Sequence, residues 1–126
     1  MAHPNTDVVQ KGYDAFARGE LDALPFADDI TFNIYGNNPM AGTYKGKKEV
    51  FGFLGRVMSE TNGSFRLEVH ALLGDDEHTV GLTTHHGERN GKQAGYNSVH
   101  VWHVRNGQMA ELFEFPQQPQ FDKFWS

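Results

Sequence analysis

Hydrophobic residues recur with two different periods along this chain of 126 residues, and the period changes near residue 64. Over residues 5–18, Val9, Tyr13 and Phe16 recur at spacings of four and three, which places them on one side of a helix. Residues 21–27 predict a short second helix, and residues 47–60 carry the apolar stripe of a third. From residue 65 onward apolar and polar residues alternate, which is typical of β-strands.

The alternating segments predict a meander of strands in the second half of the chain, at residues 65–71, 80–88, 95–104 and 109–115, with a further strand earlier, at residues 30–35. Asn90-Gly91 and Asn106-Gly107 separate alternating runs, and Asn-Gly is a strong signal for a two-residue hairpin turn. Helices first and an antiparallel meander last predict a single α+β domain over residues 1–126, with the helices on one face of the sheet.

The first hairpin determines which side chains share a face. A two-residue turn at Asn90-Gly91 sets His85 opposite Tyr96 and Thr83 opposite Ser98, and opposed residues lie on the same face. That face carries Thr83, His85, Tyr96, Ser98, His100 and Trp102, whereas the other carries Val80, Leu82, Thr84, Asn97, Val99, Val101 and His103.

Two arrangements fit these faces. In the first, the aliphatic face is the core and the polar-aromatic face is solvated. In the second, the helices cover the polar-aromatic face and enclose a pocket, and a second subunit covers the aliphatic face. Tyr96 and Trp102 favour the second arrangement, because large aromatic side chains are uncommon on a solvated face.

The second hairpin has two candidate registers that differ by one residue. A two-residue turn sets Phe113 opposite His100, and a three-residue turn sets Leu112 there. A slip of one residue turns every side chain of a strand to the other face. Either Glu111 or Glu114 therefore reaches the pocket, but not both.

The composition narrows the function classes. Eleven Lys and Arg against sixteen Asp and Glu give a net charge of -5, which argues against nucleic acid and anionic membranes as partners. The absence of Cys excludes disulfides and thiolate catalysis. No apolar run approaches the roughly 20 residues of a membrane span, and the first residues do not resemble a signal peptide, so we expect a cytoplasmic protein.

The expected pocket face holds the side chains of acid–base chemistry. His85 and His100 can take or give a proton near neutral pH, Tyr96 can donate a hydrogen bond to a developing enolate, and burial would raise the pKa of Glu114. Two of these histidines and Glu114 are permissible zinc ligands, but no local metal-binding spacing is present, so we expect neither metal nor cofactor. The expected ligand contacts are Tyr13, Phe16, Phe32, Ile34, Phe53, Thr83, Ser98, Trp102 and Leu112.

Three segments resemble the nuclear transport factor 2-like superfamily, and within it the SnoaL-like polyketide cyclases and relatives of ketosteroid isomerase. They are residues 8–32 (VVQKGYDAFARGELDALPFADDITF), 38–54 (NPMAGTYKGKKEVFGFL) and 98–115 (SVHVWHVRNGQMAELFEF). The resemblance implies a cone-shaped domain, in which three N-terminal helices pack on a curved, mixed but mainly antiparallel sheet around an apolar pocket. It also implies a homodimer through the outer face of the sheet.

The catalytic residues that a resemblance to ketosteroid isomerase implies are largely replaced by other residue types in this chain. Ile34 stands where the general base is expected, and the phenol of the first helix falls at Gly12, next to Tyr13. His100 stands at the position of the protonated aspartate, whereas the acidic residue of SnoaL-like cyclases matches Glu114. Simple ketosteroid isomerisation is therefore not expected, and two histidines with a tyrosine also resemble the scytalone dehydratase branch.

The resulting hypothesis is a protein that binds a small hydrophobic, carbonyl-bearing molecule and performs cofactor-free isomerase, cyclase or dehydratase chemistry. A non-catalytic carrier or sensor, and a dimerisation module with a filled pocket, are the alternatives. Phe121, Phe124 and Trp125 near the C-terminus are expected to pack over the pocket mouth or across the dimer, because each can bury a large area.

Overall fold

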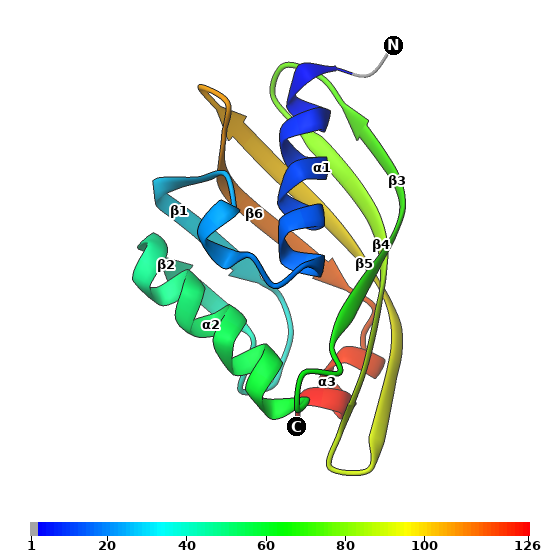
Figure 1. Ribbon diagram of the computed structural model, residues 1–126. Coiled ribbons are helices and arrows are strands. Elements are labelled where there is room, and N and C mark those ends of the chain that lie inside the picture. Colours follow the sequence, from blue (N-terminus) through cyan, green and yellow to red (C-terminus); the bar gives the residue numbers. More distant parts are fainter. Residues whose placement is uncertain (1–2) are drawn as a thin grey trace.

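The computed structural model describes residues 3–126, which form three α-helices, one 3-10 helix and a six-stranded sheet. The elements are α1 (Pro4–Ala17), the 3-10 helix η1 (Leu21–Ala23), β1 (Phe26–Ile34), β2 (Gly42–Lys45), α2 (Gly46–Glu60), β3 (Arg66–Gly74), β4 (Thr79–Arg89), β5 (Lys92–Arg105), β6 (Gln108–Pro116) and α3 (Gln120–Trp125). The strand order is β2-β1-β6-β5-β4-β3, in which β1 pairs with β6 in parallel and the other neighbours are antiparallel. The sheet curves around α1 and α2, which lie on the same side of it (Figure 1). The structure thus confirms an α+β fold with a mixed, mainly antiparallel sheet.

The N-terminal helices differ from the prediction in one respect. Helix α1 begins at Pro4, and the ring of His3 caps it by accepting a hydrogen bond from the backbone N–H of Asn5 at 3.1 Å. The second expected helix is the single turn η1, because Pro25 has no N–H to donate and holds Leu24 in an extended conformation. The third α-helix, α3, lies instead at the C-terminus, where the sequence pattern predicted none.

Strand β1 begins at Phe26, four residues before its predicted start, and β2 was not predicted. Strand β2 contains only Gly42–Lys45, which is too short to show an alternating pattern. It pairs with the far edge of β1, so it extends the sheet beneath α2 without altering the expected layers.

The first hairpin has the predicted register. His85 pairs with Tyr96 and Thr83 with Ser98. Asn90 and Gly91 have φ of 52° and 76°, as a two-residue turn of the type I′ family requires. The two faces of β4 and β5 are therefore those predicted from the sequence.

The second hairpin follows neither predicted register throughout. Its turn has two residues and pairs Arg105 with Gln108, but a β-bulge then places Ala110 as an extra residue in β6. Beyond the bulge His100 pairs with Glu114, so both predicted partners of His100, Phe113 and Leu112, are wrong. The choice between the two glutamates is resolved in favour of Glu114, which is 6 % exposed on the inner face.

The helices cover the polar-aromatic face of the sheet, as the second arrangement requires. Tyr96 and Trp102 are buried beneath them, whereas Leu82 and Val99 on the opposite face are 39 % and 37 % exposed. Within residues 3–126, no helix combines the length and hydrophobicity that crossing a membrane would require.

The C-terminal helix packs against the inner face, as predicted for its aromatic residues. Phe121, Phe124 and Trp125 are buried, and the rings of Phe121 and Tyr96 meet edge to face with centroids 5.5 Å apart. In Figure 1, α3 and the C-terminus of α2 lie at the same end of the sheet. These side chains complete one hydrophobic core with those of α1, α2 and the sheet.

Replacing Phe121 by Ala should lower the free energy of unfolding by about 3 to 5 kcal/mol, because it removes a buried ring and leaves a cavity. Leu73→Ala is the matched control, since Leu73 is 61 % exposed, and should cost less than about 1 kcal/mol. Urea unfolding followed by circular dichroism measures both values. Equal losses for the two variants would contradict the structural role of α3.

Candidate functional site

A cavity lies between the helices and the inner face of the sheet. Its volume is about 80 Å³, measured as the space open to the centres of water molecules, which corresponds to several waters or a small organic molecule. The four residues predicted to be catalytic all line it, namely His85, Tyr96, His100 and Glu114. So do six of the predicted ligand contacts, namely Tyr13, Phe16, Phe32, Phe53, Trp102 and Leu112.

Three predicted ligand contacts lie outside the cavity wall. Thr83 and Ser98 are buried on the inner face, but the Thr83 hydroxyl is turned onto the neighbouring strand, where it donates to the Ser98 carbonyl at 2.8 Å. Ile34 is buried in the hydrophobic core. The prediction that these three contact a ligand is therefore not supported by their positions.

Several residues of the wall were missed. Phe65 and Leu67 line the cavity, and the alternation over residues 65–71 together with the pairing of Leu67 with His85 could have placed them there. Met40 comes from the loop before β2, where no sequence pattern marks it. Phe121, Phe124 and Trp125 were expected over the pocket mouth or across the dimer; Phe121 and Trp125 line the cavity, whereas Phe124 does not.

Gly12 lets α1 approach the sheet closely. A Cβ atom at this position would lie 2.6 Å from the sulfur of Met109, which is far inside van der Waals contact. This sulfur belongs to the terminal atoms of a flexible side chain, so a larger residue at position 12 would require Met109 to adopt another rotamer within the cavity wall.

A chain of hydrogen bonds begins on α1 and runs across the inner face. The Trp102 indole Nε1–H donates to the Tyr13 hydroxyl oxygen at 2.9 Å, and this hydroxyl lies 2.6 Å from Nδ1 of His100. Because an indole only donates, the Tyr13 oxygen accepts from Trp102, and Nδ1 of His100 is the neighbouring atom that can accept the Tyr13 proton, so we assign the bond in that direction. A neutral His100 then carries its proton on Nε2.

The Nε2 atom of His100 faces two further groups. It lies 3.4 Å from Oε1 of Glu114 and 3.2 Å from Nε2 of His85. The remaining ring nitrogen of His85, Nδ1, is buried and has no hydrogen-bond partner in the part of the chain that the structure describes. The site therefore contains a connected set of three ionisable groups, with one polar atom left open.

Burial sets the protonation of these groups. It raises the pKa of Glu114 to about 7, and the nearby Ser98 hydroxyl opposes this rise only in part, since it forms no hydrogen bond of standard geometry. Burial lowers the pKa of His100 to about 3 and lowers that of His85 well below its ordinary value, with neighbouring His100 adding to the effect. The expectation that the histidines titrate near neutral pH is therefore wrong, and Glu114 is the group that changes charge there.

The same three side chains are of types that bind zinc, and their donor atoms all lie within 4.8 Å of one another. The register of β4, β5 and β6 brings His85, His100 and Glu114 together, although they lie far apart in the sequence. His100 Nε2 lies within hydrogen-bonding distance of His85 Nε2, at 3.2 Å, whereas its 3.4 Å distance to Glu114 Oε1 is longer than a standard hydrogen bond.

Comparison with known proteins identifies the family. A model of the SnoaL-like domain matches residues 9–112. The chain belongs to the SnoaL-like domain family. In the SnoaL-like resemblance described above, the acidic residue of the last strand corresponds to Glu114, which is the carboxyl found in the cavity.

Relatives of this SnoaL-like domain share its whole length. The uncharacterized protein Rv0034 of Mycobacterium tuberculosis is 27 % identical over 124 residues, which cover 95 % of each chain. The structure of Bal32a, from a soil-derived mobile gene cassette, superposes with a TM-score of 0.95 at 29 % identity and covers 99 % of this chain and 98 % of its own. TerC, co-crystallized with polyporic acid, has a TM-score of 0.84 at 20 % identity, with 97 % and 98 % covered, and shows the same fold.

The Glu114→Gln variant should become more stable relative to the wild type as the pH rises. The folded pKa of Glu114 lies above the ordinary value of 4.5, so its contribution to stability is complete below that value and is lost as the pH rises through about 7. Glutamine does not titrate, so the difference in unfolding free energy should shift by about 3 kcal/mol in its favour between about pH 5 and pH 8. Denaturant unfolding at both pH values measures the shift, and a difference independent of pH would contradict the raised pKa.

Proposed function

We propose that this SnoaL-like domain binds a small, largely apolar molecule with a carbonyl group and moves a proton next to that carbonyl without a cofactor. The observation that carries the proposal is Glu114, a buried carboxyl with a pKa of about 7 on the wall of an apolar cavity. Such a group can both take and give a proton near neutral pH, which suits general acid–base catalysis.

In the proposed step the ionised carboxyl of Glu114 takes a proton from the carbon next to the carbonyl. The electron pair of that C–H bond moves into a new C=C bond, and the carbonyl oxygen becomes an enolate. Tyr96 donates a hydrogen bond to this oxygen, which stabilises the charge as it develops. Return of the proton to another carbon gives isomerisation. Expulsion of a β-hydroxyl by the enolate, with its protonation by the Glu114 carboxyl, releases water and gives dehydration, and attack of the enolate carbon on an electrophilic carbon of the same molecule gives cyclisation.

The neutral histidines serve this step as hydrogen-bonding groups. His100 Nε2–H can donate to the Glu114 carboxylate, because Tyr13 occupies the other ring nitrogen. His85 lies on the other side of His100 and accepts the same proton when the carboxyl is protonated. Burial disfavours the charged form of both groups, since it lowers the pKa of His100 and raises that of Glu114, so a neutral ring beside a protonated carboxyl is the favoured state of the pair below about pH 7.

The comparisons support a small-molecule function at the level of the family. TerC shares the fold and was crystallized with a small molecule, polyporic acid. A non-catalytic carrier is the second candidate function, and one residue favours it, because Ile34 stands where the isomerase resemblance implies a carboxylate base.

We also propose that two copies associate through the outer face of the sheet. Leu82, Val99 and Phe115 are direct neighbours across β4, β5 and β6, and Tyr35 continues this outer row with its ring stacked on Phe115 at 5.0 Å. All four are between 37 % and 49 % exposed in the single chain. A contiguous apolar row of this kind is typical of a surface that a second subunit covers.

The proton transfer is tested with 1-indanone in deuterated buffer, by following the exchange of its α-protons with NMR. The wild type should accelerate exchange, with a rate that rises with pH and levels off above about 7, where the carboxylate is formed. Glu114→Gln should lower the enzymatic rate by about a hundredfold or more. Glu111→Gln, on the same strand but outside the cavity, is the matched control and should retain the rate.

The possible outcomes separate the candidate functions. Binding of the ketone without accelerated exchange would favour the carrier. Exchange that survives in Glu114→Gln would contradict the assignment of the base.

The dimer is tested by size-exclusion chromatography with light scattering. Val99→Lys places a charge in the middle of the outer row and should raise the dissociation constant of the dimer by about a hundredfold or more. Ser59→Lys adds the same charge to an exposed position of α2 and should leave the dimer intact. A wild type that is monomeric at high concentration would contradict this association.

A further inference from the structure

Two tryptophan–tyrosine pairs face the cavity, and the tryptophan of one pair, Trp125, lies in the C-terminal helix α3. Trp102 Nε1–H donates to the Tyr13 hydroxyl at 2.9 Å, and Trp125 Nε1–H donates to the Tyr96 hydroxyl at 3.0 Å. In both pairs the tyrosine oxygen must accept, because an indole has no acceptor. All four side chains line the cavity and are buried.

The pairs differ in where the phenolic proton goes. The Tyr13 hydroxyl lies 2.6 Å from His100 Nδ1, so its proton is already committed within the protein. The Tyr96 hydroxyl contacts Trp125 alone among the groups of residues 3–126 that can hydrogen-bond, and its proton has no acceptor there. Buried hydroxyl groups nearly always find a partner, so this proton is available to an acceptor within the cavity, which a water or a ligand oxygen can supply.

We propose that Trp125 is a positioning residue, which occupies the Tyr96 hydroxyl oxygen and thereby directs the phenolic proton to an oxygen acceptor of the ligand. This inference rests on the proposed function, in which Tyr96 donates to the carbonyl oxygen, and it extends the site to a residue near the end of the chain. The ligand chemistry that fits is a carbonyl or enolate oxygen. A ligand hydroxyl that donates to Tyr96 fits less well, because Trp125 already takes up one acceptor direction of the Tyr96 oxygen.

Electrostatics supports the same assignment. Burial raises the pKa of Tyr96 above its ordinary value, and nearby Glu114 raises it further, so Tyr96 stays protonated and remains a donor. The hydrogen bond from Trp125 instead lowers the pKa of Tyr96, because it draws electron density from the phenolic oxygen. It therefore makes the Tyr96 hydroxyl a stronger donor than an isolated buried phenol.

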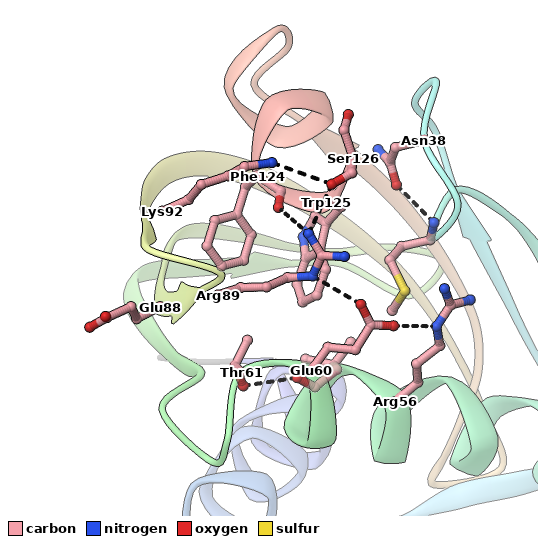
Figure 2. A network of polar contacts seen from close by, with 12 residues as sticks. Asn38, Arg56, Glu60, Thr61, Glu88, Arg89, Lys92, Phe124, Trp125 and Ser126 are labelled. Atoms are coloured by element: carbon pink, nitrogen blue, oxygen red, sulfur yellow. Dashed lines mark hydrogen bonds and ion pairs between the residues drawn. The ribbon is translucent and has the colours of Figure 1, made fainter.

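Trp125 is held in place by a network that joins three elements (Figure 2). The Arg89 guanidinium lies 5.8 Å from the centre of the Trp125 ring, and its Nη1 donates to the backbone carbonyls of Phe124 and Ser126, each at 3.0 Å. Its Nε donates to Glu60 at the end of α2, at 2.9 Å. The Arg89 side chain is only 13 % exposed, so this contact is shielded from salt and solvent.

The β4–β5 hairpin adds a second attachment. Lys92, which opens β5, donates from Nζ to the carbonyl of Lys123 at 3.0 Å and to that of Ser126 at 3.3 Å. Figure 2 shows that Arg89 and Lys92 reach the last turn of α3 from the same side. The indole is therefore fixed by α2 and by the hairpin that also carries Tyr96, which accounts for its defined orientation toward that hydroxyl.

The test replaces the indole N–H while keeping its shape. One variant carries 3-(3-benzothienyl)alanine at position 125, which has sulfur in place of the N–H, and Trp125→Phe is the second. Phe124→Leu is the matched control for the carbonyl signal alone, because Phe124 packs against Trp125 at 4.8 Å and makes no side-chain hydrogen bond, but its ring also lies 6.4 Å from that of Tyr96. Thermal unfolding of each variant verifies that it is folded.

Two signals are measured by carbon-13 NMR, the Cζ resonance of Tyr96 in the ligand-free protein and the carbonyl resonance of bound, carbonyl-labelled 1-indanone. In the benzothienyl variant the Tyr96 signal should move, and the bound carbonyl signal should lose part of the downfield shift that hydrogen bonding gives it in the wild type. The affinity for the ketone should fall by about three- to tenfold, which corresponds to one modest hydrogen bond. Tyr96→Phe should abolish the carbonyl shift, and Phe124→Leu should retain it.

The results separate this inference from the function on which it rests. If the wild type binds the ketone with a downfield carbonyl and the benzothienyl variant shows the same shift, the role of Trp125 is overturned while the proposed function stands. If the wild type does not bind the ketone, the proposed function fails, and the ligand-free Tyr96 signal decides the Trp125 contact. An unchanged Tyr96 signal overturns the inference in either case.

Discussion

The extra residue in β6, Ala110, determines which side chains of the last strand reach the cavity. The two-residue turn pairs Arg105 with Gln108, and this register without a bulge would set Phe113 opposite His100. The bulge advances β6 by one residue and sets Glu114 there instead. Because side chains alternate between faces, the single inserted residue places the Glu114 carboxyl, rather than the Phe113 ring, beside His100. The raised pKa, the contact with His100 and the proposed chemistry all depend on it.

Burial keeps the two histidines of the cavity neutral, and this gives the hydrogen bonds of the site a direction. Trp102 can only donate, so the order runs from its indole through Tyr13 to His100 and on to Glu114. A side chain that never titrates thus fixes the tautomer of a histidine two hydrogen bonds away. A charged ring at His100 would remove this order, but burial makes that form costly.

The fold and most of the site could be predicted from local patterns. The Asn90-Gly91 turn determined the faces of β4 and β5, and with them the shared position of His85, Tyr96 and His100. The bulge could not be predicted, because Ala110 carries no sequence signal for it and the bulge is visible only in the pairing of β6 with β5. The direction of the histidine pKa shifts also depends on burial, which is a property of the assembled core rather than of the sequence pattern.

The end of the Met109 side chain on β6 lies close to the backbone of α1 at Gly12, so the space at the two positions is shared. A side chain at position 12 would require the flexible end of Met109 to move to another rotamer, or a smaller residue at position 109. Substitutions at the two sites are therefore expected to be non-additive, with a shared interaction free energy rather than two separate costs. Since both residues line the cavity, its size could change in evolution by paired exchange here, without any change to the polar groups.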